Sequence, residues 1–475
     1  MTLQLYNSLT KSVEPISPLA ANTLRIYSCG PTVYDHVHIG NLSAFIVADT
    51  VRRVASTVLD VRHVMNFTDV DDKTIKKSRI EYPDLSPREA LAKSTEHYTD
   101  LFIRDLARIG NDLQAYTFVR ATDETTIDGM RKLIGEMLDS GFAYIADDGI
   151  YFSIDAYEKS GKTYGQLVEL TKSNTSAERI QNDEYDKESA HDFALWKKQK
   201  PGEPAWDFTV NDTDMTGRPG WHIECSVMSG NALGVPFDIH TGGIDLQFPH
   251  HENEIAQSTA GNQSPVYAAT FVHNEHILVD GKKMSKSLGN FFTLADITDK
   301  GVDPLAFRLL VLQSHYRKAT NFSLENVTAC TNRLKHWRVY AALRWQVPET
   351  GETDAAAPEL LAARKALLDT LNNDLDTPAA LSQIDELFAK IDTFTLPQID
   401  RNALIRFLET IDHTLGLQLL SSTPDVDEEI KHSLRRREEA RNAKDWAASD
   451  RLRDELLARG IAIRDTPSGQ IWQYA

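Results

Sequence analysis

The first third of the chain alternates between strand-like and helix-like hydrophobic patterns. A short run of β-prone residues covers 23–28 and a second covers 61–67. Between them, apolar residues at helical spacing predict a helix over residues 43–59. A strand, a helix and a second strand within about 45 residues indicate a parallel βαβ unit, and such sheets bind ligands at the carboxyl ends of their strands.

The pattern changes twice further along the chain. Residues 120–215 are charged and interrupted, as in an inserted domain, and residues 201–219 are rich in proline and polar residues and predict a loop. Strand-like segments return at residues 221–226 and 237–240. From about residue 300 apolar residues recur at helical spacing, which predicts helices, and the tail from residue 427 differs again in composition.

Composition limits the class of protein. The chain has 475 residues, of which 41% are hydrophobic and 25% charged, too many residues for one compact domain. The net charge of −18 excludes a histone-like basic coat but allows a local basic patch. No apolar run reaches the roughly 18 residues of a membrane span, and the N-terminus lacks a signal pattern, so we expect a cytoplasmic protein.

Three cysteines are too few, and odd in number, for a disulfide framework. Cys29 and Cys225 each lie at or near the end of a predicted strand, where ligands of a parallel sheet gather. Each could equally be a buried apolar residue. Cys330, on a predicted helix without chelating neighbours, is expected to be packing only.

A histidine-rich segment follows the second of these cysteines. His250 and Glu254 are four residues apart and His251 and Glu254 are three apart, so either histidine could share a helix face with the carboxylate. Two thiolates, one imidazole and one carboxylate would form a tetrahedral zinc site. The alternative is a capped helix with exposed histidines.

Residues 37–41 (VHIGN) follow the first strand and lead into a helix. Gly40 lets a flat base approach the backbone, and His38 and Asn41 can donate hydrogen bonds to phosphate at a helix N-terminus. A motif this short is weak evidence alone.

A basic loop, residues 280–290 (DGKKMSKSLGN), carries Lys283 and Lys286 three residues apart. That spacing suits a triphosphate whose leaving pyrophosphate gains charge, although an ordinary solvated turn is an equal alternative. The chain has no G-x-x-x-x-G-K-[ST] segment, which excludes a P-loop enzyme.

The tail, residues 427–475, is locally basic. Ten basic and seven acidic residues lie between 431 and 465, interleaved with Trp446 and followed by Trp472. Basic residues with aromatic rings suit single-stranded RNA. The alternative is a solvated helical face with two packing tryptophans.

Together these motifs resemble class I aminoacyl-tRNA synthetases, and most closely the cysteinyl-tRNA synthetases. Residues 38–41 (HIGN) and 283–287 (KMSKS) match the two signature motifs of the class. The cysteinyl family adds four further segments: 29–35 (CGPTVYD), 66–73 (NFTDVDDK), 220–226 (GWHIECS) and 248–254 (FPHHENE). The resemblance covers nearly the whole chain.

The resemblance implies one bound zinc per chain, held by Cys29, Cys225, His250 and Glu254, with the substrate thiolate on the metal. Zinc prefers a thiolate, so it would reject serine without an editing domain. The family's cysteine pocket is lined by matching residues in this chain: Thr32, Thr68, Trp221, His240 and Asp245.

The resemblance also implies a two-step reaction, in which ATP with Mg²⁺ converts L-cysteine to cysteinyl-adenylate and tRNA(Cys) accepts the cysteinyl group on its terminal ribose. It assigns ATP contacts to His38, Gly40, Asn41 and Lys286, and catalysis to His38, Asn41, Lys283 and Lys286. The tail would read the anticodon, with Trp472 as a stacking platform. Members of the family are usually monomers, and the resemblance implies no membrane partner.

The implied fold is α/β, a Rossmann-like class I catalytic domain with an insertion, then a helical bundle and a small anticodon-binding domain. We expect segments 1–119 (catalytic, first half), 120–215 (insertion), 216–320 (catalytic second half with the KMSKS and stem-contact region), 321–420 (bundle) and 421–475 (anticodon-binding).

Some features depart from the family pattern. Thr241 stands where the family often has a longer glycine run, and its side chain could narrow the space beside adenosine. The segment 207–216 is longer and more polar than the corresponding segment of the family. Asn41 replaces the histidine of the general class motif. Two alternative functions remain: a cysteine ligase that acylates an amine on a sugar, and a non-catalytic RNA-binding relative.

Overall fold

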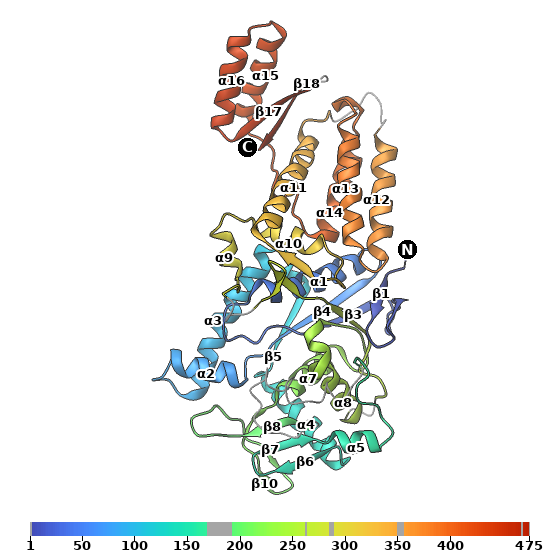
Figure 1. The fold of residues 1–475 in the computed structure, drawn as a ribbon, viewed down its shortest axis with the longest axis vertical. Coiled ribbons are helices and arrows are strands. Elements are labelled where there is room, and N and C mark those ends of the chain that lie inside the picture. The colour runs from blue at the N-terminus through green and yellow to red at the C-terminus, as the bar shows by residue number, and fades with distance from the viewer. Residues whose placement is uncertain are drawn as a thin grey trace.

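The computed structural model describes residues 2–168, 192–261, 264–284, 289–348, 356–466 and 469–474. Its central layer is a five-stranded sheet in the order β13-β12-β3-β4-β5, in which every neighbouring pair is parallel. The strands are β3 (Thr23–Ser28), β4 (Asp60–Phe67), β5 (Tyr116–Arg120), β12 (Phe237–Gly243) and β13 (Ala268–Asn274). Figure 1 shows this sheet in the middle of an elongated molecule.

The predicted βαβ unit is confirmed by β3, α1 (Ile39–Ala55) and β4. The helix begins four residues before the predicted start because His38 caps it: the imidazole Nδ1 accepts the backbone N–H of Asn41 at 3.1 Å. The signature motif therefore forms the first turn of α1, at the carboxyl edge of the sheet.

The prediction of a strand at residues 221–226 is wrong, because this segment opens the helix α7 (Trp221–Leu233). Nearly the whole first two turns of α7 are buried, including its polar residues, so no apolar stripe marks the helix. A short apolar run cannot distinguish a buried strand from a buried helix. Cys225 consequently lies on a helix and not at a strand end. The prediction for residues 237–240 is confirmed by β12.

The insertion contains a second, antiparallel sheet in the order β11-β8-β7-β6. Its elements are α4 (Glu124–Asp139), β6 (Ala143–Ala146), β7 (Gly149–Phe152), α5 (Ile154–Lys159), β8 (Phe193–Lys198) and β11 (Gly217–Pro219). Its most charged stretch lies outside the described residues.

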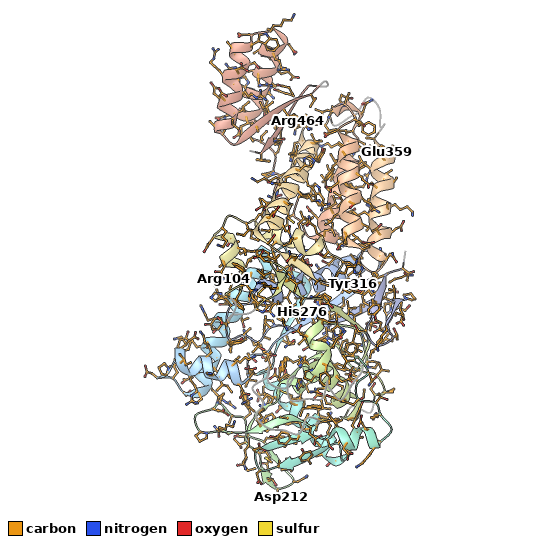
Figure 2. All side chains as sticks on the ribbon, viewed as in Figure 1. Arg104, Asp212, His276, Tyr316, Glu359 and Arg464 are labelled. Carbon is orange, nitrogen blue, oxygen red and sulfur yellow. The ribbon has the colours of Figure 1, made fainter. Side chains whose placement is uncertain are left out.

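The loop predicted at residues 201–219 is partly wrong, because it holds a hairpin of β9 (Thr209–Val210) and β10 (Thr213–Asp214). Asn211 and Asp212 both have positive φ, as a two-residue turn of this hairpin requires. Buried Phe208 and Met215 anchor its base. Asp212 marks the end of the molecule opposite Arg464 (Figure 2). This hairpin accounts for the extra length of residues 207–216.

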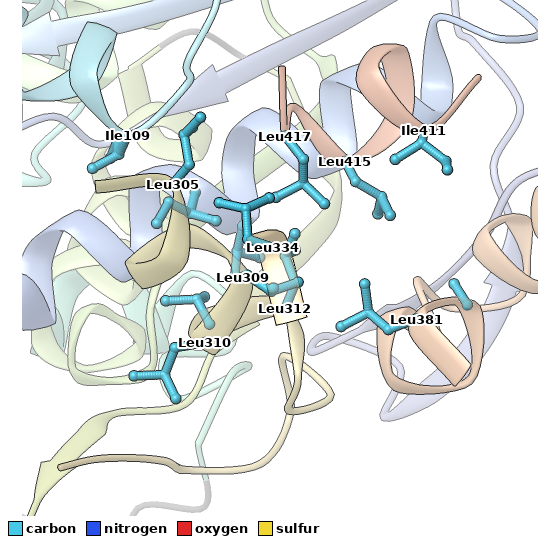
Figure 3. Packing of buried hydrophobic residues seen from close by; sticks show 14 of the residues in the cluster. Ile109, Leu305, Leu309, Leu310, Leu312, Leu334, Leu381, Ile411, Leu415 and Leu417 are labelled. Carbon is cyan, nitrogen blue, oxygen red and sulfur yellow. The ribbon is translucent and has the colours of Figure 1, made fainter. Parts of the chain in front are cut away.

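Helices follow the catalytic sheet, as predicted. They are α10 (Pro304–Leu312), α11 (Leu324–Ala342), α12 (Ala357–Asn372), α13 (Thr377–Ile391) and α14 (Arg401–Leu415). Leucines of these helices form one apolar core that continues to Ile109 at the end of α3 (Pro87–Arg108), as Figure 3 shows. Cys330 is fully buried in this core, as expected.

The C-terminal segment forms a small separate lobe (Figure 1). It consists of α15 (Glu428–Asn442), α16 (Trp446–Ala458), β17 (Ile461–Thr466) and β18 (Gly469–Tyr474). The backbone of Trp472 exchanges hydrogen bonds with the side chain of Gln346 at 2.8 and 3.0 Å, and Arg464 pairs with Asp392 at 3.0 Å. These contacts attach the lobe to the helical bundle.

The remaining elements surround the catalytic sheet. They are β1 (Gln4–Asn7), β2 (Ser12–Pro15), α2 (Asp72–Glu81), α8 (Glu252–Gly261), β14 (Ile277–Val279), β15 (Lys282–Lys283), α9 (Leu294–Thr298) and β16 (Thr320–Phe322). In the described part of the chain, none of the helices combines the length and the apolarity that crossing a membrane requires.

Candidate active site and metal centre

Four side chains from distant parts of the sequence meet at the carboxyl edge of the parallel sheet. Cys29 follows β3 and Cys225 lies in the second turn of α7, while His250 lies in the short helical segment Gln247–His251 just before α8 and Glu254 lies in the first turn of α8. The two Sγ atoms are 3.7 Å apart, and Glu254 Oε1 lies 3.7 Å from Cys29 Sγ and 3.0 Å from His250 Nε2. All four ligand atoms fall within 4.8 Å of one another.

These distances fit a tetrahedral zinc site. With a Zn–S bond of about 2.3 Å, two sulfur ligands of tetrahedral zinc stand about 3.8 Å apart. The observed Sγ–Sγ separation is close to that value and too long for a disulfide. All four side chains are buried.

A second set of donors shares two members with the first. His240 Nε2 lies 2.8 Å from Glu254 Oε2, and His251 Nε2 lies 3.4 Å from Cys29 Sγ. Cys29, His240, His251 and Glu254 also bring ligand atoms within 4.8 Å of one another. Both histidines that the spacing left open therefore reach the cluster.

Sequence reasoning missed a layer of groups around these donors. His222 Nδ1 lies 2.9 Å from His250 Nδ1, and the hydroxyl of Tyr267 donates to Glu254 at 2.8 Å. His273 Nε2 lies 2.8 Å from His251 Nδ1. Only His222 stood in a segment already singled out, three residues before Cys225.

Burial and mutual contacts control the ionisation of the cluster. Burial raises the pKa of Cys29, whose thiol also donates to the Cys225 sulfur. Burial would raise the pKa of Cys225 too, but the bond from Cys29 and the nearby His250 lower it to about 6. Cys225 is therefore the sulfur closest to a thiolate, the form that binds metals.

The residues matched to the family's cysteine pocket surround the same edge. Trp221 is half-buried and stacks on the His250 ring with centroids 4.2 Å apart. Thr32 and Thr68 are paired through their backbones, and His240 is buried against Glu254. Asp245 is exposed in the turn after β12, so it lies at the solvent side of the cluster.

Gly30 lets the end of β3, next to Cys29, lie against the end of β4. A Cβ at Gly30 would lie 1.7 Å from the backbone oxygen of Asn66, so no other residue allows the two strand ends to approach so closely. The Asn66 side chain accepts the Gly30 N–H at 2.8 Å. Thr241, next to this junction, is buried and its hydroxyl lies 2.6 Å from that of Ser28.

The two signature motifs meet at the start of α1. The backbone of His38 bridges to that of Thr293, and the N–H of Ile39 donates to Phe292 O at 2.9 Å. A Cβ at Gly40 would lie 3.7 Å from Met284 Cε, which places the beginning of the basic loop over this glycine. Lys283 is exposed in β15. Lys286 lies outside the described residues.

The His38 imidazole is oriented for donation. Its Nδ1 accepts the N–H of Asn41, so a neutral ring carries its proton on Nε2. The Asn41 side chain is exposed beside the same helix N-terminus. Both groups can therefore offer hydrogen bonds to an anion at this end of α1.

The structure corrects the expectation that Trp472 offers a stacking surface, because its side chain is only 6% exposed. It packs in the apolar core of the C-terminal lobe with Leu434 and Leu456. Trp446, at the first position of α16, is 56% exposed, and the Arg441 guanidinium lies 5.8 Å from its ring centroid. Among the described aromatic residues of this lobe, Trp446 is therefore more exposed than Trp472 and than Tyr474, which is 37% exposed.

Comparisons with known families and proteins agree along the whole chain. Residues 15–332 match the family of class I (C) tRNA synthetase catalytic domains, and residues 423–472 match the cysteinyl-tRNA ligase anticodon binding domain. The cysteine--tRNA ligase of Chlamydia felis is 39% identical, over 98% of this chain and 97% of that protein. That of Solibacter usitatus is 38% identical over the full length of both.

Solved structures support the same fold at low sequence identity. Mycobacterium tuberculosis methionyl-tRNA synthetase in complex with methionyl-adenylate has a TM-score of 0.60 at 16% identity, covering 90% of this chain and 96% of that one. A leucyl-tRNA synthetase from Agrobacterium radiobacter, in a ternary complex with tRNA, has a TM-score of 0.59 at 12% identity, covering 87% and 88%. At these identities the likeness concerns the fold alone.

Proposed function

This chain belongs to the cysteinyl-tRNA synthetase family, and we propose that it activates L-cysteine with ATP and transfers the cysteinyl group to the 3′-terminal ribose of tRNA(Cys). The observation that carries this proposal is the cluster of Cys29, Cys225, His250 and Glu254 at the sheet edge where the HIGN motif begins α1. These residues could hold a metal that selects sulfur, and the start of α1 could bind phosphate.

We assign the metal ligands to Cys29, Cys225, His250 and Glu254, one zinc per chain. Two sulfurs in the set favour it over the alternative with His240 and His251, because soft thiolates select zinc over harder cations. When bound, zinc would supply a Lewis acid that binds the thiolate of cysteine and does not bind the hydroxyl of serine. Trp221 holds the His250 ring by stacking, and Thr32, Thr68, His240 and Asp245 would complete the cysteine pocket.

The first chemical step depends on positioning and on stabilisation of developing negative charge, and it requires no covalent bond between the substrate and the protein. The cysteine carboxylate attacks the α-phosphorus of ATP, and pyrophosphate leaves with the electrons of the broken P–O bond. His38, through Nε2–H, and Asn41 donate to the phosphate oxygens, while Gly40 leaves room for the nucleotide. Lys283 and Lys286 would neutralise the charge growing on pyrophosphate, and Mg²⁺ would accompany ATP.

In the second step a terminal ribose hydroxyl of tRNA attacks the acyl carbon and AMP leaves. The C-terminal lobe would hold the anticodon far from this reaction. Trp446 supplies an exposed ring for base stacking, and exposed arginines of α15 and α16, such as Arg435 and Arg451, supply positive charge. Trp446 replaces Trp472 in this role because Trp472 is buried.

Other features of the proposal follow from this activity. The five segments 1–119, 120–215, 216–320, 321–420 and 421–475 would divide catalysis, insertion, bundle and anticodon binding as predicted. We propose a monomer that works in the cytoplasm, where tRNA and ATP are available.

One alternative shares the adenylate step but acylates an amine on a sugar. The C-terminal lobe with its exposed Trp446 favours tRNA as the acceptor. The test has two parts: cysteine-dependent exchange of labelled pyrophosphate into ATP without RNA, then charging of tRNA(Cys) against an amino sugar. We expect exchange in the first part, abolished by Lys286→Ala, and acylation of tRNA alone in the second. Acylation of the amino sugar would refute the proposal.

A further inference from the structure

The short helix α2 carries an unpaired basic stripe beside the catalytic edge. Lys73, Lys76 and Arg79 follow one another at three-residue spacing, so they share one face of the helix, and all three are exposed. On a chain with a net charge of −18, such a concentration of positive charge is a local exception.

The acidic residues of α2 do not neutralise this stripe, because they are engaged elsewhere. Asp72 pairs with Lys197 and with Arg218, both from the insertion sheet. Glu81 accepts hydrogen bonds from Tyr98 at 2.6 Å and Ser94 at 2.7 Å and pairs with Lys77 at 3.3 Å. Within the described ranges, Lys73, Lys76 and Arg79 form no ion pair.

The position of α2 links the stripe to the site. The helix begins four residues after Thr68, at the carboxyl end of β4, and Lys73 Nζ lies 5.8 Å from the ring centroid of Tyr34 in the segment that follows Cys29. From there the stripe runs outward for about 9 Å, given a helix rise of 1.5 Å per residue. In Figure 1 α2 projects on the same side as α9 and the C-terminal lobe.

We propose that the stripe of Lys73, Lys76 and Arg79 binds phosphates of the acceptor arm of tRNA and guides its 3′ end to the adenylate. This inference rests on the proposed function, in which that end must reach the sheet edge. About 9 Å of helix can face two or three phosphates of one strand. The anticodon lobe lies at the far end of the molecule, so the acceptor arm is the part of the tRNA within reach.

The experiment compares the double variant K76Q/R79Q with wild type, leaving Lys73 beside the site unchanged. We expect its KM for tRNA(Cys) to rise about tenfold. A plot of the logarithm of the tRNA association constant against the logarithm of salt concentration should become less steep, its slope shrinking in magnitude by about 1.5. Cysteine-dependent pyrophosphate exchange, which needs no tRNA, should be unchanged. The matched control K365Q/K390Q removes two exposed lysines of α12 and α13 on the opposite side and should leave the KM for tRNA unaltered.

A photoreactive benzoylphenylalanine at Ile80, which is 69% exposed, adds a positional readout. We expect crosslinks to the acceptor arm. An unchanged KM for tRNA in K76Q/R79Q, an equal loss of pyrophosphate exchange, or crosslinks confined to the anticodon arm would each overturn the inference. Wild type that charges no tRNA would instead refute the proposed function, so the two failures are distinguishable.

Discussion

The Sγ atoms of Cys29 and Cys225 lie 3.7 Å apart although 196 residues separate them in the sequence. One sulfur follows a strand of the parallel sheet and the other sits in the second turn of a helix that packs across the same edge. This juxtaposition, with His250 and Glu254 alongside, is the structural basis of the proposed zinc site and of the proposed selection for cysteine.

Cys225→Ser should remove zinc and cysteine charging together, because a serine hydroxyl ionises too weakly to replace a thiolate ligand. Metal content by mass spectrometry and charging of tRNA check this prediction. Cys330→Ser is the matched control: Cys330 is buried in the apolar core, away from the cluster, so zinc content should stay at one per chain. A Cys225→Ser protein with full charging would contradict the ligand assignment.

The two adjacent histidines should differ in their effect on the metal. His250→Ala is expected to lose zinc, because it removes the imidazole that lies 3.0 Å from Glu254. His251→Ala should retain zinc and lose charging efficiency through the disturbed contact with Cys29. Zinc titration of both purified variants separates them. Zinc loss in His251→Ala with retention in His250→Ala would favour the second donor set.

The sequence predicted the part of this site that depends on local pattern. The βαβ unit, β12 and the i, i+4 relation of His250 and Glu254 follow from periodicity and spacing, and all appear in the structure. The pattern around Cys225 predicts a strand, because the buried helix α7 shows no amphipathic stripe. Spacing alone does not choose between His250 and His251, because residues three and four apart both share a helix face with Glu254. In the structure both histidines reach the cluster.

Tertiary contacts decided what the sequence pattern left open. The sequence does not distinguish Trp472 from Trp446, because both lie in the same basic tail. In the structure only Trp472 is covered by the hairpin and helices of the lobe. Nothing local pairs Asp49 of α1 with Arg308 of α10, 259 residues away, yet they are fully buried and 2.7 Å apart. Such contacts depend on how the elements pack.

Asp49 should stabilise the fold in a pH-dependent way. Burial alone would raise the pKa of Asp49, but Arg308, Arg53 and Arg52 hold it well below the ordinary range. Its stabilising contribution is therefore complete above about pH 4, the pKa of an unfolded aspartate, and declines as the pH falls further. Asp49→Asn should cost about 3–5 kcal/mol at neutral pH, since it leaves buried arginine charge unpaired.

Urea unfolding of wild type and Asp49→Asn at pH 7, 5 and 3.5 tests this sign. The difference in unfolding free energy should be equal at pH 7 and 5 and smaller at pH 3.5. Asp369→Asn, which removes an exposed partner of Lys365, should cost about 1 kcal/mol or less at every pH. A difference that widens on acidification would contradict the account.

The two tail tryptophans should affect different properties. Trp446→Ala is expected to raise the KM for tRNA(Cys) about tenfold, because stacking on a base contributes roughly 1–3 kcal/mol, and Trp446→Phe should largely restore it. Trp472→Ala should instead lower the thermal stability of the C-terminal lobe, since it empties an apolar core. Steady-state charging and calorimetry distinguish the two. Equal effects of Trp446→Ala and Trp472→Ala on stability would contradict the assignment.

The most direct measurement is charging of total tRNA with labelled cysteine and with labelled serine, using zinc-loaded enzyme and enzyme dialysed against a chelator. The account predicts charging with cysteine alone, at the level set by tRNA(Cys), and its loss when zinc is removed and return when zinc is restored. Charging with serine by the loaded enzyme, or full cysteine charging by protein shown to contain no zinc, would contradict it.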